Sequence, residues 1–391
     1  MKPEGLDRAL LKIIYLDAAA IAVAQTLGLD GLVSGLFTLT FPLTVVLWLR
    51  TVRERMRLPE LLTLVTLGLA AVSVLLDAWI SGAEVRPAYF RKWIIFCMTL
   101  LFFGAAYRLE GSAEVTRWVK RLGDLLAVWL PGAYILGGDA MFRIGGRVSG
   151  YLTFGFTNPN LAAMVLACLY MLQIMGIFES KGWKKGVRLA LAGILAYFLW
   201  LTRSRNCMLA MAVFTFCACM LPLAGERKLR MPGWMAALVS ILPALFVAGY
   251  LLIVSMGRVP DWLRLFVGDG KGLDSRMAVW GPALEALGES PLIGAYCRIS
   301  GGLGSSQMHN SHLDIAASYG VPVLVPVCVL LGMYLHQGGR EYRSRSHFCN
   351  MLAFACGLLM GLGEAAVFSG GLGIYIFVGM FLHLANEEEA V

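Results

Sequence analysis

The chain has 391 residues, of which 58% are hydrophobic and 15% charged, with a formal net charge of +8. Soluble globular domains have about 45–50% apolar and about 25% charged residues, so this composition excludes an ordinary soluble protein and indicates a polytopic helical membrane protein. The positive charge predicts basic cytoplasmic loops and not a nucleic-acid partner, because lysine and arginine gather on the cytoplasmic side of membrane proteins.

Apolar runs recur along the whole chain, and a helical span needs about 20 apolar residues. We therefore expect one all-α membrane domain over residues 1–391 with about twelve transmembrane helices. Eleven is the alternative count, because the last run is short and 93–107 and 188–202 are marginal. The runs are centred on 10–28, 31–49, 61–80, 93–107, 122–137, 158–178, 188–202, 207–224, 235–255, 313–335, 349–368 and 372–385.

The basic residues predict the orientation. If the N-terminus is cytoplasmic, about two thirds of the 33 lysines and arginines fall in cytoplasmic segments, as the positive-inside rule requires. Both termini are then cytoplasmic. Residues 256–312, the longest interval without an apolar run, form an extracytoplasmic loop between spans nine and ten.

The loop contains one expected helix. Asp274 and Ser275 are predicted to cap a helix that begins at Arg276, runs for about three turns and ends before Pro291. Its apolar side chains recur at helical spacing, so we expect an amphipathic helix against the membrane surface or over the bundle, with Trp280 as an interfacial anchor. The apolar face consists of Met277, Trp280, Leu284 and Leu287.

The loop closes on His309, at the predicted outer membrane boundary. A neutral imidazole there can take a proton from a hydroxyl nucleophile. The alternative is an interfacial histidine without a chemical role. A metal site of the two histidines His309 and His312 with Asp314 is a weaker alternative, because the spacing matches no strong metal motif. The nine cysteines show no CxxC spacing, so neither a zinc site nor a disulfide framework is expected.

Arginines gather on the same predicted side. Arg203 and Arg205 lie in the turn after the run 188–202, and Arg276 lies in the first turn of the loop helix. A guanidinium group matches phosphate oxygens, so the three are candidates for a diphosphate clamp. The alternative is that they extend towards water at the membrane edge.

Ionisable groups inside apolar runs are functional candidates in membranes. Glu364 lies near the outer end of its run and is expected to face the same extracytoplasmic cavity as His309 and the arginines. Asp17 is expected to pair with another helix. Asp77 has no assigned role. Asn158 is predicted to cap the sixth span, with Pro159 at the first helical position. Asn160 is then a candidate lining residue of the cavity, as is Asn310.

Four motifs in order resemble the O-antigen ligase and polymerase family. They are Gly155-Phe156-Thr157-Asn158-Pro159-Asn160, Thr202-Arg203-Ser204-Arg205, Ser275-Arg276 with Ser290-Pro291-Leu292-Ile293-Gly294, and His309-Asn310 followed by Leu313 and Gly320. The matches cover about residues 150–335, while the first five spans match only in hydropathy.

The resemblance implies a GT-C-like glycosyltransferase of the bacterial plasma membrane, with an extracytoplasmic active site and no metal or other cofactor. Such enzymes transfer a glycan from undecaprenyl diphosphate to an acceptor hydroxyl on a glycan, a lipid or the cell wall. By position, His309 would activate the acceptor and Arg205 and Arg276 would bind the departing diphosphate. Arg203 matches less securely.

Several functions stay open at this point. A ligase and a repeat-unit polymerase differ only in the acceptor, and the sequence does not separate them. A lipid-linked glycan transporter or flippase would show inverted repeats and broken helices with coordinating polar groups, which the sequence does not indicate. A membrane scaffold without catalytic function would leave the histidine and arginines without a role.

Overall fold

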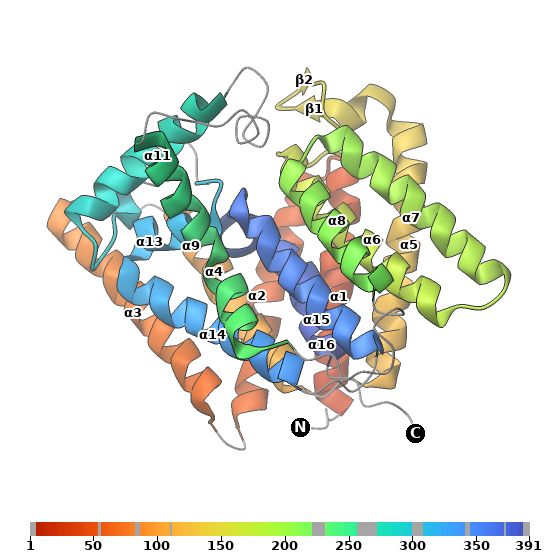
Figure 1. The fold of residues 1–391 in the computed structure, drawn as a ribbon, viewed down its shortest axis with the longest axis horizontal. Coiled ribbons are helices and arrows are strands. Elements are labelled where there is room, and N and C mark those ends of the chain that lie inside the picture. Colours follow the sequence, from red (N-terminus) through yellow and green to blue (C-terminus); the bar gives the residue numbers. More distant parts are fainter. Residues whose placement is uncertain are drawn as a thin grey trace.

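The computed structural model describes residues 5–53, 56–82, 87–109, 112–220, 231–255, 272–298, 308–340, 345–370 and 373–385. These residues are almost entirely helical, with one two-stranded hairpin (Figure 1). The helices are α1 (Gly5–Thr26), α2 (Asp30–Val52), α3 (Leu58–Ser81), α4 (Pro87–Arg108), α5 (Ala113–Gly137), α6 (Pro159–Glu179), α7 (Trp183–Thr202), α8 (Arg205–Met220), α9 (Gly233–Ser255), α11 (Gly272–Glu289), α13 (Ser311–Tyr319), α14 (Val321–Arg340), α15 (Arg345–Leu359) and α16 (Ile374–Ala385). Short 3-10 segments η1 (Gly138–Phe142) and η2 (Met360–Leu362) and a π-helical turn η3 (Ala366–Gly370) complete the helical structure.

The expected fold class is confirmed at the level of an all-α polytopic membrane protein. In the described part of the chain, nine helices are long and apolar enough to cross a membrane, namely α1 to α7, α9 and α14. Helices α8 and α16 are apolar but shorter. Most of their bounds lie within a few residues of the predicted runs, because length and hydropathy define a span directly.

Two predicted spans are interrupted. The run 313–335 is divided at Gly320, whose φ of 84° lies in the left-handed region that glycine adopts readily. The run 349–368 ends as a regular helix at Leu359 and continues through η2 and η3. The sequence did not indicate either break. Non-helical backbone at membrane depth is tolerated where protein buries it, and the described residues around these breaks are mostly buried.

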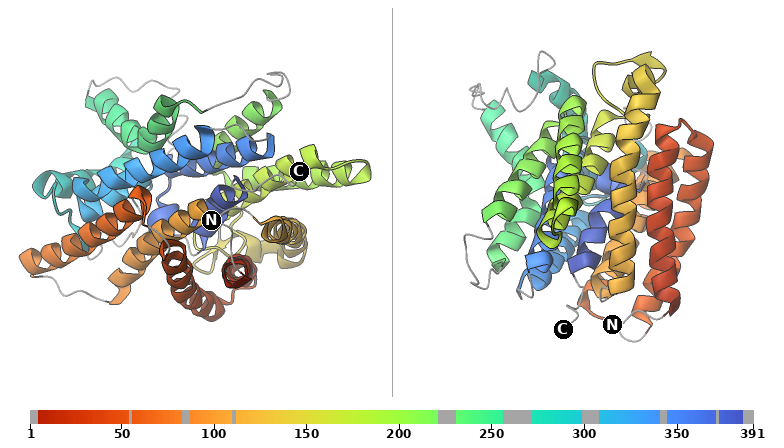
Figure 2. Two further views of the ribbon diagram at one scale, coloured as in Figure 1. Left: turned by 90° about the horizontal axis from the view of Figure 1, so that it is seen from below. Right: turned by 90° about the vertical axis from the view of Figure 1, so that its right-hand side faces the viewer.

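The two ends of the bundle are distinct. Helix α1 begins and α16 ends at the same end, the lower end in Figure 1 and in the right-hand view of Figure 2. Arg8 of α1 pairs with Glu114 at the start of α5, at 3.5 Å. His347 of α15 contacts the carbonyl oxygen of Ala385, the last residue of α16. The first turn of α1 and the last turn of α16 therefore share one end of the bundle.

The opposite end carries the hairpin of β1 (Arg143–Ile144) and β2 (Arg147–Val148), which pair antiparallel. Gly145 and Gly146 both have positive φ, as a tight two-residue hairpin turn requires. The segment after β2 returns to the α7–α8 turn, where the Leu152 amide donates to the Leu201 carbonyl at 3.1 Å. The hairpin, the α7–α8 turn and the start of α6 therefore share one end.

Helix α11 covers part of this end and packs against α13, and its Trp280 also contacts α9 (Figure 1). It begins at Gly272, so the predicted cap at Asp274 and Ser275 was wrong. Trp280 is 2% exposed and packs edge-on against Tyr250 of α9, so it is a core residue and not the predicted interfacial anchor. Residues 256–271 and 299–307 of the predicted loop lie outside the described residues, as do the side chains of Arg276 and Met277.

Candidate functional site

His309 lies just before α13 and faces a buried carboxylate. Its Nδ1 atom is 3.1 Å from Oε1 of Glu364, whose side chain is 1% exposed, while the His309 side chain is 29% exposed. The φ of His309 is 49°, in the left-handed region that non-glycine residues rarely adopt. One side of the imidazole is thus paired in the protein interior, and the ring still reaches the surface.

Glu364 lies in the irregular segment between η2 and η3 and joins His309 to α6. Its Oε1 atom also accepts a hydrogen bond from Nδ2 of Asn160. The predicted cap of α6 is confirmed: Asn158 Oδ1 accepts from the Asn160 amide at 2.9 Å, and Pro159 is the first residue of the helix. The cap directs Asn160 towards Glu364. Glu364 Oε2 is buried and has no hydrogen-bond partner among the described residues.

The start of α8 lies beside the same carboxylate. A Cβ atom on Gly363 would be 1.4 Å from Nδ2 of Asn206, so the Asn206 amide occupies the space that a larger residue at 363 would fill. Asn206 follows Arg205, the first residue of α8, which is half-buried. The contact therefore brings the α7–α8 turn, with Arg205, close to the His309–Glu364 pair.

The three candidate arginines have different surroundings. Arg203 is exposed, has a φ of 55°, and places its guanidinium 5.5 Å from the centre of the Tyr151 ring, a cation–π arrangement. Arg205, two residues later, is half-buried. Arg276 belongs to α11, but its side chain is outside the described residues. Arg205 is thus the candidate that the contact of Asn206 with Gly363 places near Glu364.

Asn310 has a structural position. It is fully buried, and its Oδ1 atom caps α13 by accepting from the amides of His312 and Leu313 at 3.1 and 2.9 Å. Its Nδ2 atom donates to the carbonyl oxygens of Pro243 in α9 and Leu362 in η2. Both polar atoms of the Asn310 side chain, which was predicted to line a cavity, therefore make hydrogen bonds that fix the start of α13 directly after His309.

His312 and Asp314 each have a protein partner of their own. His312 Nε2 is 2.6 Å from the Ser240 carbonyl oxygen, and its Nδ1 is 3.2 Å from Ser311 Oγ. Asp314 forms an ion pair with Lys92 at 2.8 Å. Across the described ranges, no three His, Cys, Asp or Glu side chains converge as they would around a metal ion. The metal alternative gains no support from these contacts.

The other intramembrane carboxylates connect elements. Asp17 of α1 accepts a hydrogen bond from Thr40 of α2, so the expected pairing with another helix is confirmed. Asp77 of α3 accepts from the Cys297 amide at 2.7 Å and from Arg298 Nε at 3.1 Å. Asp77 thus anchors the segment that follows α11 to the bundle, a role that the sequence did not predict.

Gly294 and Gly320, two glycines of the motifs that resemble the family, lie where two loops are in close contact. A Cβ on Gly294 would be 2.6 Å from the Ser318 carbonyl carbon, and one on Gly320 would be 2.4 Å from the Leu292 carbonyl oxygen. The Val321 amide donates to the Pro291 carbonyl at 2.9 Å. The loop after α11 therefore crosses the α13–α14 break at backbone contact distance, which only glycine permits at both positions.

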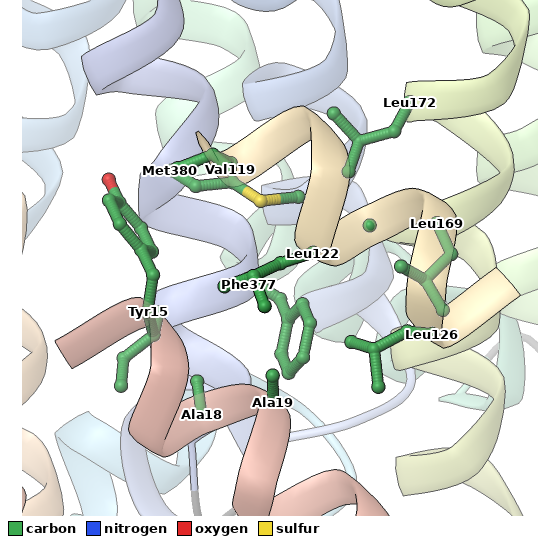
Figure 3. A pocket seen from close by; sticks show the side chains of 12 residues that line it. Tyr15, Ala18, Ala19, Val119, Leu122, Leu126, Leu169, Leu172, Phe377 and Met380 are labelled. Carbon is green, nitrogen blue, oxygen red and sulfur yellow. The ribbon is translucent and has the colours of Figure 1, made fainter. Parts of the chain in front are cut away.

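A small cavity of about 20 Å³ lies elsewhere, between α1, α5, α6 and α16 (Figure 3). Its lining is apolar and includes Tyr15, Leu169, Phe377 and Met380. A space of this size holds about one water molecule, and none of the residues around His309 lines it. The candidate site is therefore defined by polar contacts and not by this cavity.

The geometry defines what His309 can do. The Glu364 carboxylate accepts a hydrogen bond from His309 Nδ1–H and orients the ring, so that Nε2 is the nitrogen that can take up a proton from a reactant. The same carboxylate stabilises the imidazolium that results. This pair, with Arg205 nearby, suits proton abstraction from a hydroxyl next to an anionic group. No protein-family model matches the chain, and no curated protein matches it.

Proposed function

We propose that the protein is a membrane glycosyltransferase that transfers a glycan from an undecaprenyl-diphosphate-linked donor to an acceptor hydroxyl, as O-antigen ligases do. The observation that carries the proposal is the His309–Glu364 pair, whose Nδ1 and Oε1 atoms are 3.1 Å apart and whose carboxylate is 1% exposed. The order of the family-like motifs supports it, because their residues come together around this pair: Asn160 contacts Glu364, and Arg205 precedes the residue that packs on Gly363.

In the proposed reaction, His309 Nε2 accepts the proton of the acceptor hydroxyl while the hydroxyl oxygen attacks the anomeric carbon of the donor sugar. The bond between that carbon and the diphosphate oxygen breaks, and undecaprenyl diphosphate leaves with both bonding electrons. Arg205 and Arg276 compensate the negative charge that develops on the leaving group. The proton remains on the imidazole, where the Glu364 carboxylate stabilises it.

The proposed topology has twelve spans in the bacterial plasma membrane, with α8, α15 and α16 as short spans and α13–α14 as one broken span. The shared end of α1 and α16 supports an even count, and therefore twelve and not eleven. With the termini cytoplasmic, the His309 site and the loop 256–312 face the extracytoplasmic side. The lipid tail of the donor then stays in the bilayer while the diphosphate reaches the site.

Two other functions differ in outcome. A polymerase of the same family would extend a lipid-linked glycan, whereas a ligase would move it to a lipid or cell-wall anchor. A flippase is favoured by one observation, the broken helix α13–α14 with buried Lys92 and Asp314, because transporters place polar groups at such breaks. A flippase would move the donor across the bilayer without cleaving it.

The experiment is to reconstitute the purified protein in vesicles with an undecaprenyl-diphosphate glycan and candidate acceptors, and to identify the products by mass spectrometry. Glycan on a new anchor indicates a ligase, and an elongated lipid-linked glycan indicates a polymerase. An intact donor that appears in the opposite leaflet would contradict the transferase proposal and favour the flippase.

A further inference from the structure

The residue before His309 is held from both sides. Met308 is fully buried, and its carbonyl oxygen accepts a hydrogen bond from Trp280 Nε1 of α11 at 2.7 Å. Its amide lies 3.4 Å from Oδ1 of Asp314 in α13. Both polar groups of the Met308 backbone are therefore directed at side chains from two different helices, which fixes the peptide planes on either side of it.

A buried lysine completes this contact. Lys92 of α4 is 5% exposed, and its Nζ atom is 2.8 Å from Asp314 Oδ1 and 2.9 Å from Ser318 Oγ. Burying such a pair removes two charges from water, and replacing one by apolar residues is often neutral or stabilising. Stability of the fold is thus a weak reason for a Lys–Asp pair at this place, and a requirement for geometry is a stronger one.

His309 needs such a geometric constraint. A left-handed backbone conformation costs a non-glycine residue about 1–2 kcal/mol, so it persists only where the surroundings hold it. Asn310 is fixed as the cap of α13, directly after His309. Without a corresponding constraint at Met308, rotation about the His309 backbone would carry the imidazole away from Glu364.

We propose that Trp280, Asp314 and Lys92 are positioning residues that clamp Met308 and thereby hold His309 against Glu364. We call these three residues the Met308 clamp. The clamp links α4, α11 and α13 to the histidine through the backbone of Met308. Its effect on turnover rests on the proposed function, whereas its effect on the position of the imidazole does not.

The first variant is Lys92→Met/Asp314→Leu, which replaces the ion pair by apolar side chains. The matched control is Arg108→Met/Glu60→Leu. Arg108 lies on the same helix α4, and its ion pair with Glu60 is as well buried, with exposed fractions of 4% and 3% and a separation of 3.1 Å. From residue 92 to residue 108 the helix rises about 24 Å, so the control pair is remote from His309.

The second variant is Trp280→Phe, which keeps a buried aromatic ring but removes the Nε1–H that donates to Met308. Its control is Trp48→Phe, because Trp48 is also buried and its Nε1 has no hydrogen-bond partner among the described residues. This variant tests the clamp without touching the ion pair. It therefore decides the proposal if the Lys92/Asp314 variant does not fold.

Two measurements are made on the full-length protein. The first is the rate at which diethyl pyrocarbonate modifies His309, followed by peptide mass spectrometry, with the exposed His336 as an internal reference. The second is the kinetics of glycan transfer. We expect the His309 modification rate to change at least about threefold and kcat to fall at least about tenfold with little change in KM, since displacing a catalytic group by about 1 Å can cost up to about 10²-fold.

In both control variants, diethyl pyrocarbonate should modify His309 at the wild-type rate, and glycan transfer should also proceed at the wild-type rate. Modification of His309 at the wild-type rate in both clamp variants would overturn the proposal. If the wild-type protein transfers no glycan, the modification rates still decide the clamp, and the proposed function fails separately. If transfer is normal in folded clamp variants, the clamp is wrong while the proposed function stands.

Discussion

Replacing Glu364 by glutamine removes the charge beside His309 and keeps an oxygen in place for Asn160. In the wild-type protein Glu364 is 1% exposed and its Oε1 lies 3.1 Å from His309 Nδ1. The carboxylate stabilises the imidazolium that forms when His309 takes up the acceptor proton. A hydrogen bond to a charged group contributes about 1.5–3 kcal/mol. At about 1.4 kcal/mol for each factor of ten, Glu364→Gln should lower kcat by about 10- to 150-fold.

The assay is steady-state glycan transfer by the purified variant in vesicles, together with its thermal unfolding midpoint. The control is Glu179→Gln, which removes a partly exposed carboxylate that pairs with Lys120 at 2.8 Å at the opposite end of the bundle. That pair contributes at most about 1 kcal/mol, so kcat should not change. A wild-type kcat for Glu364→Gln would refute the assignment and leave Glu364 a purely structural link between His309 and α6.

Two further substitutions test the surroundings of Glu364. Arg205→Lys should lower the rate of glycan transfer about tenfold or more, because a point charge does not replace a guanidinium fork on a diphosphate. An unchanged rate with a bound donor would contradict the role of Arg205 in binding the diphosphate leaving group. Gly363→Ala should lower both the unfolding midpoint and kcat, since the new Cβ would meet Asn206 at 1.4 Å, whereas Gly68→Ala, with open space around it, should change neither. Equal effects of the two glycine substitutions would show that the α8 contact is not needed.

The regular helices were the most predictable part of the fold. Helix α6 begins at Pro159, within one residue of the predicted run, because the Asn-Pro cap and the apolar run mark the same boundary. The break at Gly320 was not predictable from hydropathy. Its neighbours are as apolar as a continuous span, and the contact that requires glycine comes from Leu292, on a loop that hydropathy does not place.

The candidate site was predictable as separate residues and not as a constellation. His309 and Glu364 each stood out as an ionisable group at a predicted membrane boundary. Nothing in the sequence pairs them, because the pairing depends on the non-helical segment after α15 that turns Glu364 inward. Asn160 followed from the predicted cap, which fixes the direction of the first helical turn.

The Met308 clamp shows what the sequence concealed. Lys92 directly precedes the apolar run 93–107, a position at which the sequence indicates a loop charge, although its ammonium group is buried against Asp314. Trp280 has the amphipathic spacing of an interfacial residue, and only the packing of α11 on α9 and α13 buries it. Both errors arise because periodicity indicates an apolar face but not which element covers it.

The most direct test of the central claim is the rate of glycan transfer by His309→Ala compared with the wild-type protein, measured in the same vesicles with the same donor and acceptor. The account predicts that the wild-type protein forms the glycosylated acceptor and releases undecaprenyl diphosphate. It predicts that His309→Ala remains folded and binds the donor but loses at least about 10²-fold in kcat, the lower range of general-base contributions. Transfer by folded His309→Ala at the wild-type rate would contradict the claim.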